Sequence, residues 1–136
     1  MTSSAEAQIE LVRKAIDAFN RRDTDAMIAL APAEGFEYDW TRSIAPNRGI
    51  YRGIEGMKEF VEDQWSAFEE VRIEPSEYLA RGRHVVVPAT VHGRGRGRGG
   101  VAVSANSAQL FTFENGRLMR ITLYQGREEA LAAASK

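Results

Sequence analysis

The sequence predicts an α+β fold, in which helices cover one face of a curved antiparallel sheet. Helical periodicity dominates the early part of the 136-residue chain, and consecutive strand-like runs dominate the late part. The last two runs, residues 101–113 and 117–125, flank Glu114-Asn115-Gly116, which is a strong hairpin signal. The expected order is α-α-β-α-β-β-β-β plus a short C-terminal helix, in a single domain over residues 1–136.

The composition narrows the possible functions. The chain is 43% hydrophobic and 27% charged, which is ordinary for a soluble globular protein. It has no cysteine, which excludes disulfides, a thiol nucleophile and thiolate metal ligands. A net charge of −1 gives no overall attraction to nucleic acid or membranes. The N-terminus lacks the features of a signal peptide, and no apolar run approaches the ~20 residues that span a bilayer. We therefore expect a cytoplasmic protein without nucleic-acid or membrane partners.

Three helices are expected before the late strands. Residues 3–21 begin with a possible capping box of Ser3 and Glu6, and their apolar side chains recur at steps of four and three. Asp23 or Thr24 caps a short helix over residues 25–31, and Pro32 prevents its continuation. Residues 53–68 carry apolar side chains along one side and form the third helix.

The strands alternate with turn signals. Residues 36–41 place aromatic side chains at positions 36, 38 and 40 and acidic ones at 37 and 39, which is strict alternation. Residues 42–52 contain Pro46, Asn47 and Gly49 and are expected to form a loop. Further strands are predicted over residues 71–80 and 84–94, before the late hairpin, and residues 127–134 form the terminal helix.

Two registers are open to the hairpin. A two-residue Asn-Gly turn pairs Glu114 with Arg117, whereas a three-residue loop with Gly116 in a bulge pairs Phe113 with Arg117. The registers differ by one residue, which reverses the side chains that share a face. We prefer the three-residue loop because it collects a mostly apolar face of Ser107, Gln109, Phe111, Phe113, Met119, Ile121 and Leu123.

Several segments in this order resemble the NTF2-like superfamily, in its SnoaL-like and ketosteroid-isomerase-like branch. They are residues 18–23 (AFNRRD), 51–60 (YRGIEGMKEF), 93–97 (GRGRG), 111–117 (FTFENGR) and 124–131 (YQGREEAL). The resemblance covers nearly the whole chain. It implies a cone formed by a bent sheet and helices, an apolar pocket for a small hydrophobic molecule, no cofactor, and often a homodimer through the outer sheet face. The fold hosts isomerases, hydratases, epoxide hydrolases, cyclases and non-enzymatic binding modules.

Ketosteroid isomerases give the sharpest comparison. They use a carboxylate base and two acidic hydrogen-bond donors, and the pKa values of these groups are tuned by their surroundings. The resemblance places the base at Asp39. The family's tyrosine donor falls on Ala15, and its protonated aspartic acid falls at or next to Gln109. One of three roles therefore survives, with Gln109 as a weaker amide donor.

Two function hypotheses follow. In the first, a cofactor-free isomerase-, hydrolase- or cyclase-type enzyme uses Asp39 as base and Gln109 as polar partner, with walls of Tyr38, Trp40, Trp65 and Phe111. In the second, the same fold is a non-catalytic ligand-binding or dimeric protein-interaction module. Alternation favours the second, because the aromatic side chains of residues 36–40 then face inward and Asp39 faces outward. Trp65 and Phe111 can equally be core residues.

The remaining polar features are assigned to the surface. His84 and His92 share the outer face of their strand, and neither has a second ligand at metal spacing, so no metal site is expected. Arg94, Arg96 and Arg98 lie in a short glycine-rich stretch without interleaved aromatic residues, which disfavours single-strand nucleic-acid binding. In the preferred register, the homodimer interface would contain Ala108, Leu110, Thr112, Thr122 and Tyr124.

Overall fold

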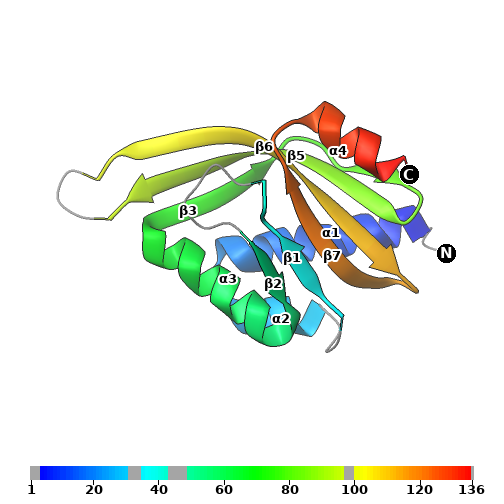
Figure 1. The fold of residues 1–136 in the computed structure, drawn as a ribbon, viewed down its shortest axis with the longest axis horizontal. Helices are drawn as coiled ribbons and strands as arrows, with labels where there is room; N and C mark the ends of the chain where they lie inside the picture. The colour runs from blue at the N-terminus through cyan, green and yellow to red at the C-terminus, as the bar shows by residue number, and fades with distance from the viewer. Residues whose placement is uncertain (1–3, 31–34, 43–48, 97–99, 136) are drawn as a thin grey trace.

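The computed structural model describes residues 4–30, 35–42, 49–96 and 100–135. Within these residues the predicted α+β class is confirmed, with four helices and one curved, open seven-stranded sheet (Figure 1). The elements are, in order, α1 (Ser4–Asn20), α2 (Thr24–Leu30), β1 (Glu37–Asp39), β2 (Ile50–Arg52), α3 (Gly53–Ala67), β3 (Phe68–Pro75), β4 (Leu79–Arg81), β5 (His84–Gly95), β6 (Ala102–Glu114), β7 (Arg117–Tyr124) and α4 (Arg127–Ala134).

The sheet has the strand order β2-β1-β7-β6-β5-β3, and β4 adds to β5. Helices α1, α2 and α3 bury the larger apolar core against one face, which we call the inner face. Helix α4 packs against the opposite, outer face (Figure 1). The predicted antiparallel sheet has one exception, because β1 runs parallel to β7. A parallel pair needs a long connection, and here most of the chain separates the two strands.

The first two helices are fixed by polar contacts at their ends. The carboxylate of Asp23 accepts a hydrogen bond from the backbone N–H of Ala26 at 3.1 Å, so Asp23 is the cap of α2. The Asn20 amide exchanges hydrogen bonds of 2.9 and 2.8 Å with the backbone of Ile73, which joins the end of α1 to β3. Ser3 and Pro32, which define two of the predicted boundaries, lie outside the described residues.

Two segments differ from the sequence prediction. Residues 50–52, expected in a loop, form β2 and pair antiparallel with β1, while residues 43–48 lie outside the described part of the chain. The strand expected over residues 71–80 is divided into β3 and β4, since Pro75 has no N–H with which to continue the ladder. The Arg96 side chain donates hydrogen bonds to the carbonyls of Trp65 and Ser66, in the last turn of α3, at 2.6 and 2.9 Å. Arg98 is not among the described residues.

The β6–β7 hairpin turns through two residues, so the preferred three-residue loop is wrong. Asn115 and Gly116 have φ angles of 51° and 77°, as a type I′ turn requires. Glu114 therefore pairs with Arg117. The turn residues have the left-handed geometry that Asn-Gly favours, and this local preference decided the register.

A bulge next to the turn restores the predicted inner face. Phe113 pairs with Leu118, but the register then shifts by one residue between Phe113 and Thr112. Beyond this shift Phe111 lies opposite Ile121, and Gln109 lies opposite Leu123. The grouping of these apolar side chains with Gln109 is therefore confirmed, although Met119 leaves the group and lines the outer face.

The outer face is partly covered by α4, and this corrects the predicted dimer interface. Ala108 and Leu110 are buried, together with Val86, against Ala130 and Ala134 of the helix. A second copy cannot reach these two positions unless α4 is displaced. The remaining predicted interface residues, Thr112, Thr122 and Tyr124, line a groove beside α4. The homodimer itself stays a prediction. None of the described helices is long and apolar enough to cross a bilayer.

Candidate functional site

The short strand β1 separates an aromatic inner site from a polar outer one. Its alternation turns the rings of Phe36, Tyr38 and Trp40 into the core, while Glu37 and Asp39 face the outer groove. The parallel register with β7 agrees, because Tyr38 lies beside inward-facing Ile121. The five aromatic and acidic residues of this segment therefore contribute to two different surfaces.

The inner site is a small cavity between the helices and the sheet. Its volume is about 20 Å³, which is enough for a single water molecule. The Tyr38 ring stacks on Phe60 with their centroids 4.0 Å apart, and the Trp40 ring meets Phe60 edge-on at 4.7 Å. Burial raises the pKa of the Tyr38 phenol, so this group stays neutral. The cavity is lined by Phe19, Tyr38, Trp40, Phe60, Gln64, Val71, Ile73, Val91 and Gln109.

Three buried polar atoms near this cavity have no hydrogen-bond partner among the described residues. They are the Gln109 side-chain nitrogen Nε2, the Ser107 Oγ and the Trp65 Nε1. Gln109 is only 3% exposed and lines the cavity. Ser107 stands two positions along the same strand face, about 7 Å away by strand geometry. Native proteins satisfy nearly all such atoms, so these atoms point to a water or a ligand inside the fold.

Trp65 stands beside the cavity rather than in its wall. Its ring centroid lies 6.2 Å from that of Phe19, which lines the cavity, and the Arg22 guanidinium carbon lies 5.4 Å from the Trp65 centroid. Trp65 also lines an open groove of about 440 Å³, and Val71 borders both the groove and the cavity. Phe111, by contrast, is 1% exposed and packs in the core. The inner site thus brings together Tyr38, Trp40 and Gln109.

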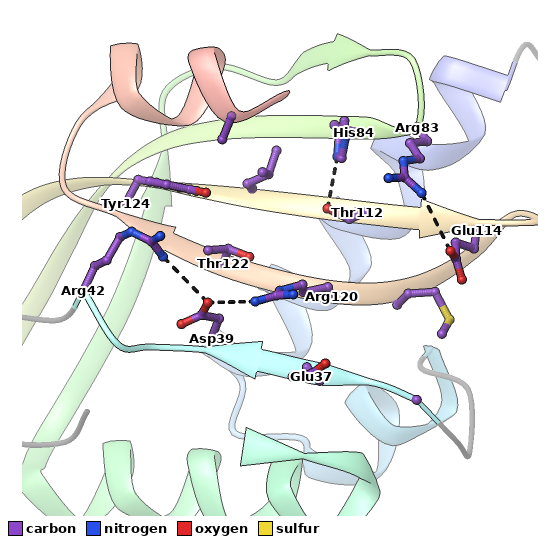
Figure 2. A pocket seen from close by; sticks show the side chains of 14 residues that line it. Glu37, Asp39, Arg42, Arg83, His84, Thr112, Glu114, Arg120, Thr122 and Tyr124 are labelled. Atoms are coloured by element: carbon purple, nitrogen blue, oxygen red, sulfur yellow. Dashed lines mark hydrogen bonds and ion pairs between the residues drawn. The ribbon is translucent and has the colours of Figure 1, made fainter. Parts of the chain in front are cut away.

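The outer site is a polar groove of about 450 Å³ formed by β1, β5, β6, β7 and α4 (Figure 2). Asp39 lies at its base, with 6% of its surface exposed. An Arg120 guanidinium nitrogen is 2.8 Å from the Asp39 Oδ2, and an Arg42 nitrogen is 3.7 Å away. Figure 2 shows these two guanidinium groups reaching Asp39 from opposite sides. Asp39 and Gln109 therefore lie on opposite faces of the sheet and are not brought together.

The surroundings of Asp39 favour its charged form. Burial alone raises the pKa of the carboxyl, but hydrogen bonds from the Thr41 hydroxyl (2.7 Å) and N–H (3.1 Å) and from Arg120 outweigh it. The pKa of Asp39 is consequently held below its usual range, which makes the carboxylate a weaker base. With these contacts, Asp39 holds β1 against β7 through Arg120 and also pairs with Arg42.

The rest of the outer groove is also internally paired. Arg83 lies 3.7 Å from Glu114, and the His84 Nδ1 lies 3.0 Å from the Thr112 hydroxyl (Figure 2). Burial, followed by the nearby Arg83 charge, lowers the pKa of His84. The predicted outward placement of this histidine is confirmed. Among the described residues, no cluster of three or more His, Asp or Glu side chains is arranged to hold a metal ion.

Replacing Asp39 with asparagine should destabilise the protein by about 1–3 kcal/mol near neutral pH, toward the lower end because Arg120 is partly solvated. Asp39 has a depressed pKa in the folded state, so its contribution is fully present above the unfolded value of about 4 and is lost as the pH falls through the folded value. Urea unfolding from pH 7 to pH 2.5 should show the difference between wild type and Asp39→Asn shrinking below about pH 4. A difference that stayed constant would contradict this account.

The comparisons with known proteins agree with the fold. The open sheet with helices packed on one face is the architecture of the NTF2-like class of proteins. The sequence model of the SnoaL-like domain matches residues 12–121, and the chain belongs to this family, as the sequence resemblance predicts. No protein with a curated description matches the chain.

Solved structures share the fold over nearly their whole length. TerC, co-crystallised with polyporic acid, is 18% identical, with 96% of this chain and 99% of that chain covered and a TM-score of 0.75. A proposed polyketide cyclase from Xanthomonas campestris pv. campestris is 24% identical (98% and 100% covered, TM-score 0.76). A protein with a ketosteroid isomerase-like fold from Catenulispora acidiphila DSM 44928, crystallised with trimethylamine, is 18% identical (92% and 92% covered, TM-score 0.74).

Sequence reasoning missed the partners of Asp39. Arg120 is 81 positions away and meets Asp39 only because β1 pairs with β7 in parallel. It also missed Ser107 as a site residue, although its strand alternation with Gln109 was the available signal. The parallel pairing had no sequence signal, since three residues of β1 are too few to specify a neighbouring strand.

Proposed function

We propose that this chain binds a small, uncharged, hydrophobic molecule with a hydrogen-bond acceptor in the inner site. The observation that carries the proposal is the buried and unpartnered Nε2 of Gln109, with the Ser107 hydroxyl two positions away on the same face. Leaving such a donor unpaired costs about 1–3 kcal/mol, and a ligand carbonyl or ether oxygen relieves that cost.

The lining of the inner site indicates the class of ligand. Its walls are aromatic and aliphatic, with two amide side chains and no ionisable group other than the neutral phenol of Tyr38. A charged ligand would lose its hydration here without gaining a counter-ion, which is strongly unfavourable. An apolar ring system with one or two acceptor oxygens satisfies both the rings and the amides. TerC was co-crystallised with a small molecule, polyporic acid, and the Catenulispora protein forms a complex with trimethylamine, which supports a binding role for this fold.

A ligand larger than water requires the inner site to expand. Trp65 is half-buried between the cavity and the 440 Å³ groove, and Val71 borders both spaces. A rotation of the Trp65 side chain would join the two spaces, and the contacts of its ring with Phe19 and Arg22 hold it in place without a ligand. In this proposal, a ligand enters the inner site by displacing the Trp65 ring.

Binding without catalysis is the better-supported form of this proposal. The enzyme hypothesis requires Asp39 to act as a base on a ligand beside Gln109, but Asp39 faces the outer groove and is held by Arg120. A base on the inner face would have to come from another group. The described lining contains no carboxylate or histidine that could take this role.

The test compares two molecules of nearly the same shape, 1-tetralone and its hydrocarbon counterpart tetralin, by titration calorimetry. Wild type should bind tetralone more tightly, and Gln109→Leu should weaken tetralone by about tenfold while leaving tetralin unchanged. Asp39→Asn, on the other face, serves as the control and should bind both molecules as wild type does. Equal affinity of wild type for the two molecules would overturn the proposal.

Deuterium exchange separates binding from catalysis in the same samples. If Asp39 or another group acts as a base, the α-hydrogens of bound 1-tetralone should exchange with D₂O faster than in buffer, as followed by proton NMR. We expect no acceleration in wild type. An acceleration that disappears in Asp39→Asn would instead establish the enzyme hypothesis.

A further inference from the structure

Strand β6 extends beyond its neighbour β7 and leaves an open edge. It pairs with β5 over residues 102–112, but its pairing with β7 begins only at Ala108, opposite Tyr124. Residues 102–107 therefore have β5 on one side and no strand among the described residues on the other. Figure 1 shows this part of β5 and β6 projecting away from α4, with β3 along the other side of β5.

The hydrogen-bond pattern identifies the backbone groups on this edge. Val101 accepts a hydrogen bond from the N–H of Gly95 on β5 at 3.0 Å. Antiparallel pairs alternate, so odd-numbered residues of this segment bond to β5, and Ala102, Ser104 and Asn106 direct their N–H and C=O groups to the open edge. Pro88 agrees with this assignment, because it lies opposite Ala108 and has no N–H to offer.

The edge lacks the features that normally prevent pairing. Residues 101–107 (VAVSANS) contain no charge, proline or glycine. Val101 is 69% exposed and Val103 is 49% exposed, and these are two of the three most exposed large apolar residues in the described chain. Monomeric proteins protect such edges with charged residues, proline or a bulge. An uncharged, partly apolar open edge is instead suited to adding another strand.

We propose that this edge pairs with the same edge of a second copy of the chain, in antiparallel orientation. With Ser104 opposite Ser104 of the second copy, Ala102 lies opposite Asn106, and every free backbone group of the three residues finds a partner. Val103 then packs against Ala105 of the second copy, and the symmetry repeats this contact. Because the segment is uncharged, the pairing brings no like charges together.

The length of the free edge fits this register. Continuing the pairing by one hydrogen-bonded position would set residue 100 of the second copy opposite Ala108, whose edge is already occupied by Tyr124. The added strand thus ends where β7 begins. The two sheets join into one continuous sheet, and neither α4 nor the inner site is involved. The dimer is therefore independent of ligand binding.

A disulfide test measures the register directly, because the natural chain has no cysteine. In Ser104→Cys the two new residues face each other with Cα atoms about 5.5 Å apart, which lies in the disulfide range. In Asn106→Cys the Cα atoms of the two new cysteines are about 13 Å apart. Each substitution removes one exposed side-chain hydrogen bond, to His92 and Thr90 respectively, so the variants are matched. Mild oxidation should cross-link Ser104→Cys and not Asn106→Cys.

Sedimentation analysis of the cysteine-free protein provides the second measurement. Wild type should form a dimer, and Ser104→Pro should raise its dissociation constant by about tenfold or more, since proline removes an edge N–H without touching the β5 ladder. Ser104→Ala keeps that N–H and should remain dimeric, and circular dichroism should show all variants folded. A monomeric wild type, an unaffected Ser104→Pro dimer, or equal cross-linking of both cysteine variants would overturn the proposal.

Discussion

Replacing Phe60 with alanine is expected to lower the free energy of unfolding by about 3–5 kcal/mol, the range measured for large buried aromatic side chains. Phe60 is 2% exposed and stands at the centre of the aromatic cluster. Its ring centroid lies 4.0 Å from that of Tyr38, 4.7 Å from Trp40, 5.5 Å from Tyr51 and 6.2 Å from Phe19. The substitution removes the contacts through which α3 is packed against β1, β2 and α1.

Urea unfolding followed by far-UV circular dichroism measures this loss. Phe60→Leu is the matched control, because it keeps most of the buried volume and should cost less than about 1.5 kcal/mol. The difference in unfolding free energy between the two variants reports the buried volume that leucine retains, and the loss in Phe60→Leu itself reports the ring contacts. If both substitutions had the same small effect, the aromatic cluster would not be the centre of the inner core.

Replacing Gly56 with alanine should destabilise the protein by about 2 kcal/mol or more, although alanine is the better helix former by about 1 kcal/mol. Gly56 lies in α3, where an added Cβ would stand 2.6 Å from the carbonyl carbon of Tyr51. This atom belongs to the backbone of β2, so α3 and β2 must separate to make room. The predicted sign is thus opposite to the one that helix propensity alone indicates.

Thermal and urea unfolding of Gly56→Ala should be compared with Gly126→Ala. At Gly126, the N-cap of α4, an added Cβ meets no atom within 4 Å and the backbone is extended, so the change should cost only the cap preference of glycine over alanine, about 1 kcal/mol or less. A Gly56→Ala protein as stable as wild type would mean that α3 and β2 pack less closely than the structure indicates.

The elements that depend on local patterns were predictable, and those that depend on distant pairing were not. The alternation of β1, the valine face of β5 and the bounds of α4 follow directly from periodicity. Strand β2 was missed because Ile50–Arg52 is short and follows a segment rich in turn residues. The β6–β7 hairpin combines a correct and an incorrect prediction. Its inner face is as predicted but its turn is not, because a bulge compensates for the one-residue difference in register.

The candidate site divides in the same way. Tyr38, Trp40 and Gln109 meet at one cavity because strand alternation directs all three inward. The orientation of Asp39 followed from the same alternation, but its ion pair with Arg120 depends on a parallel pairing that leaves no local pattern. Trp65 and Phe111 illustrate a further limit, since an aromatic residue on an apolar face can equally line a pocket or fill a core.

The two tryptophans occupy different surroundings, and this gives the chain two optical probes. Trp40 is 8% exposed within the aromatic cluster, whereas Trp65 is half-buried under Arg22 beside the open groove. A buried indole emits at shorter wavelengths than a hydrated one, so the fluorescence of the chain has an interior and a peripheral component. In a Trp65→Phe variant the remaining emission comes from Trp40 alone, and a quencher dissolved in water would then measure how often the interior opens.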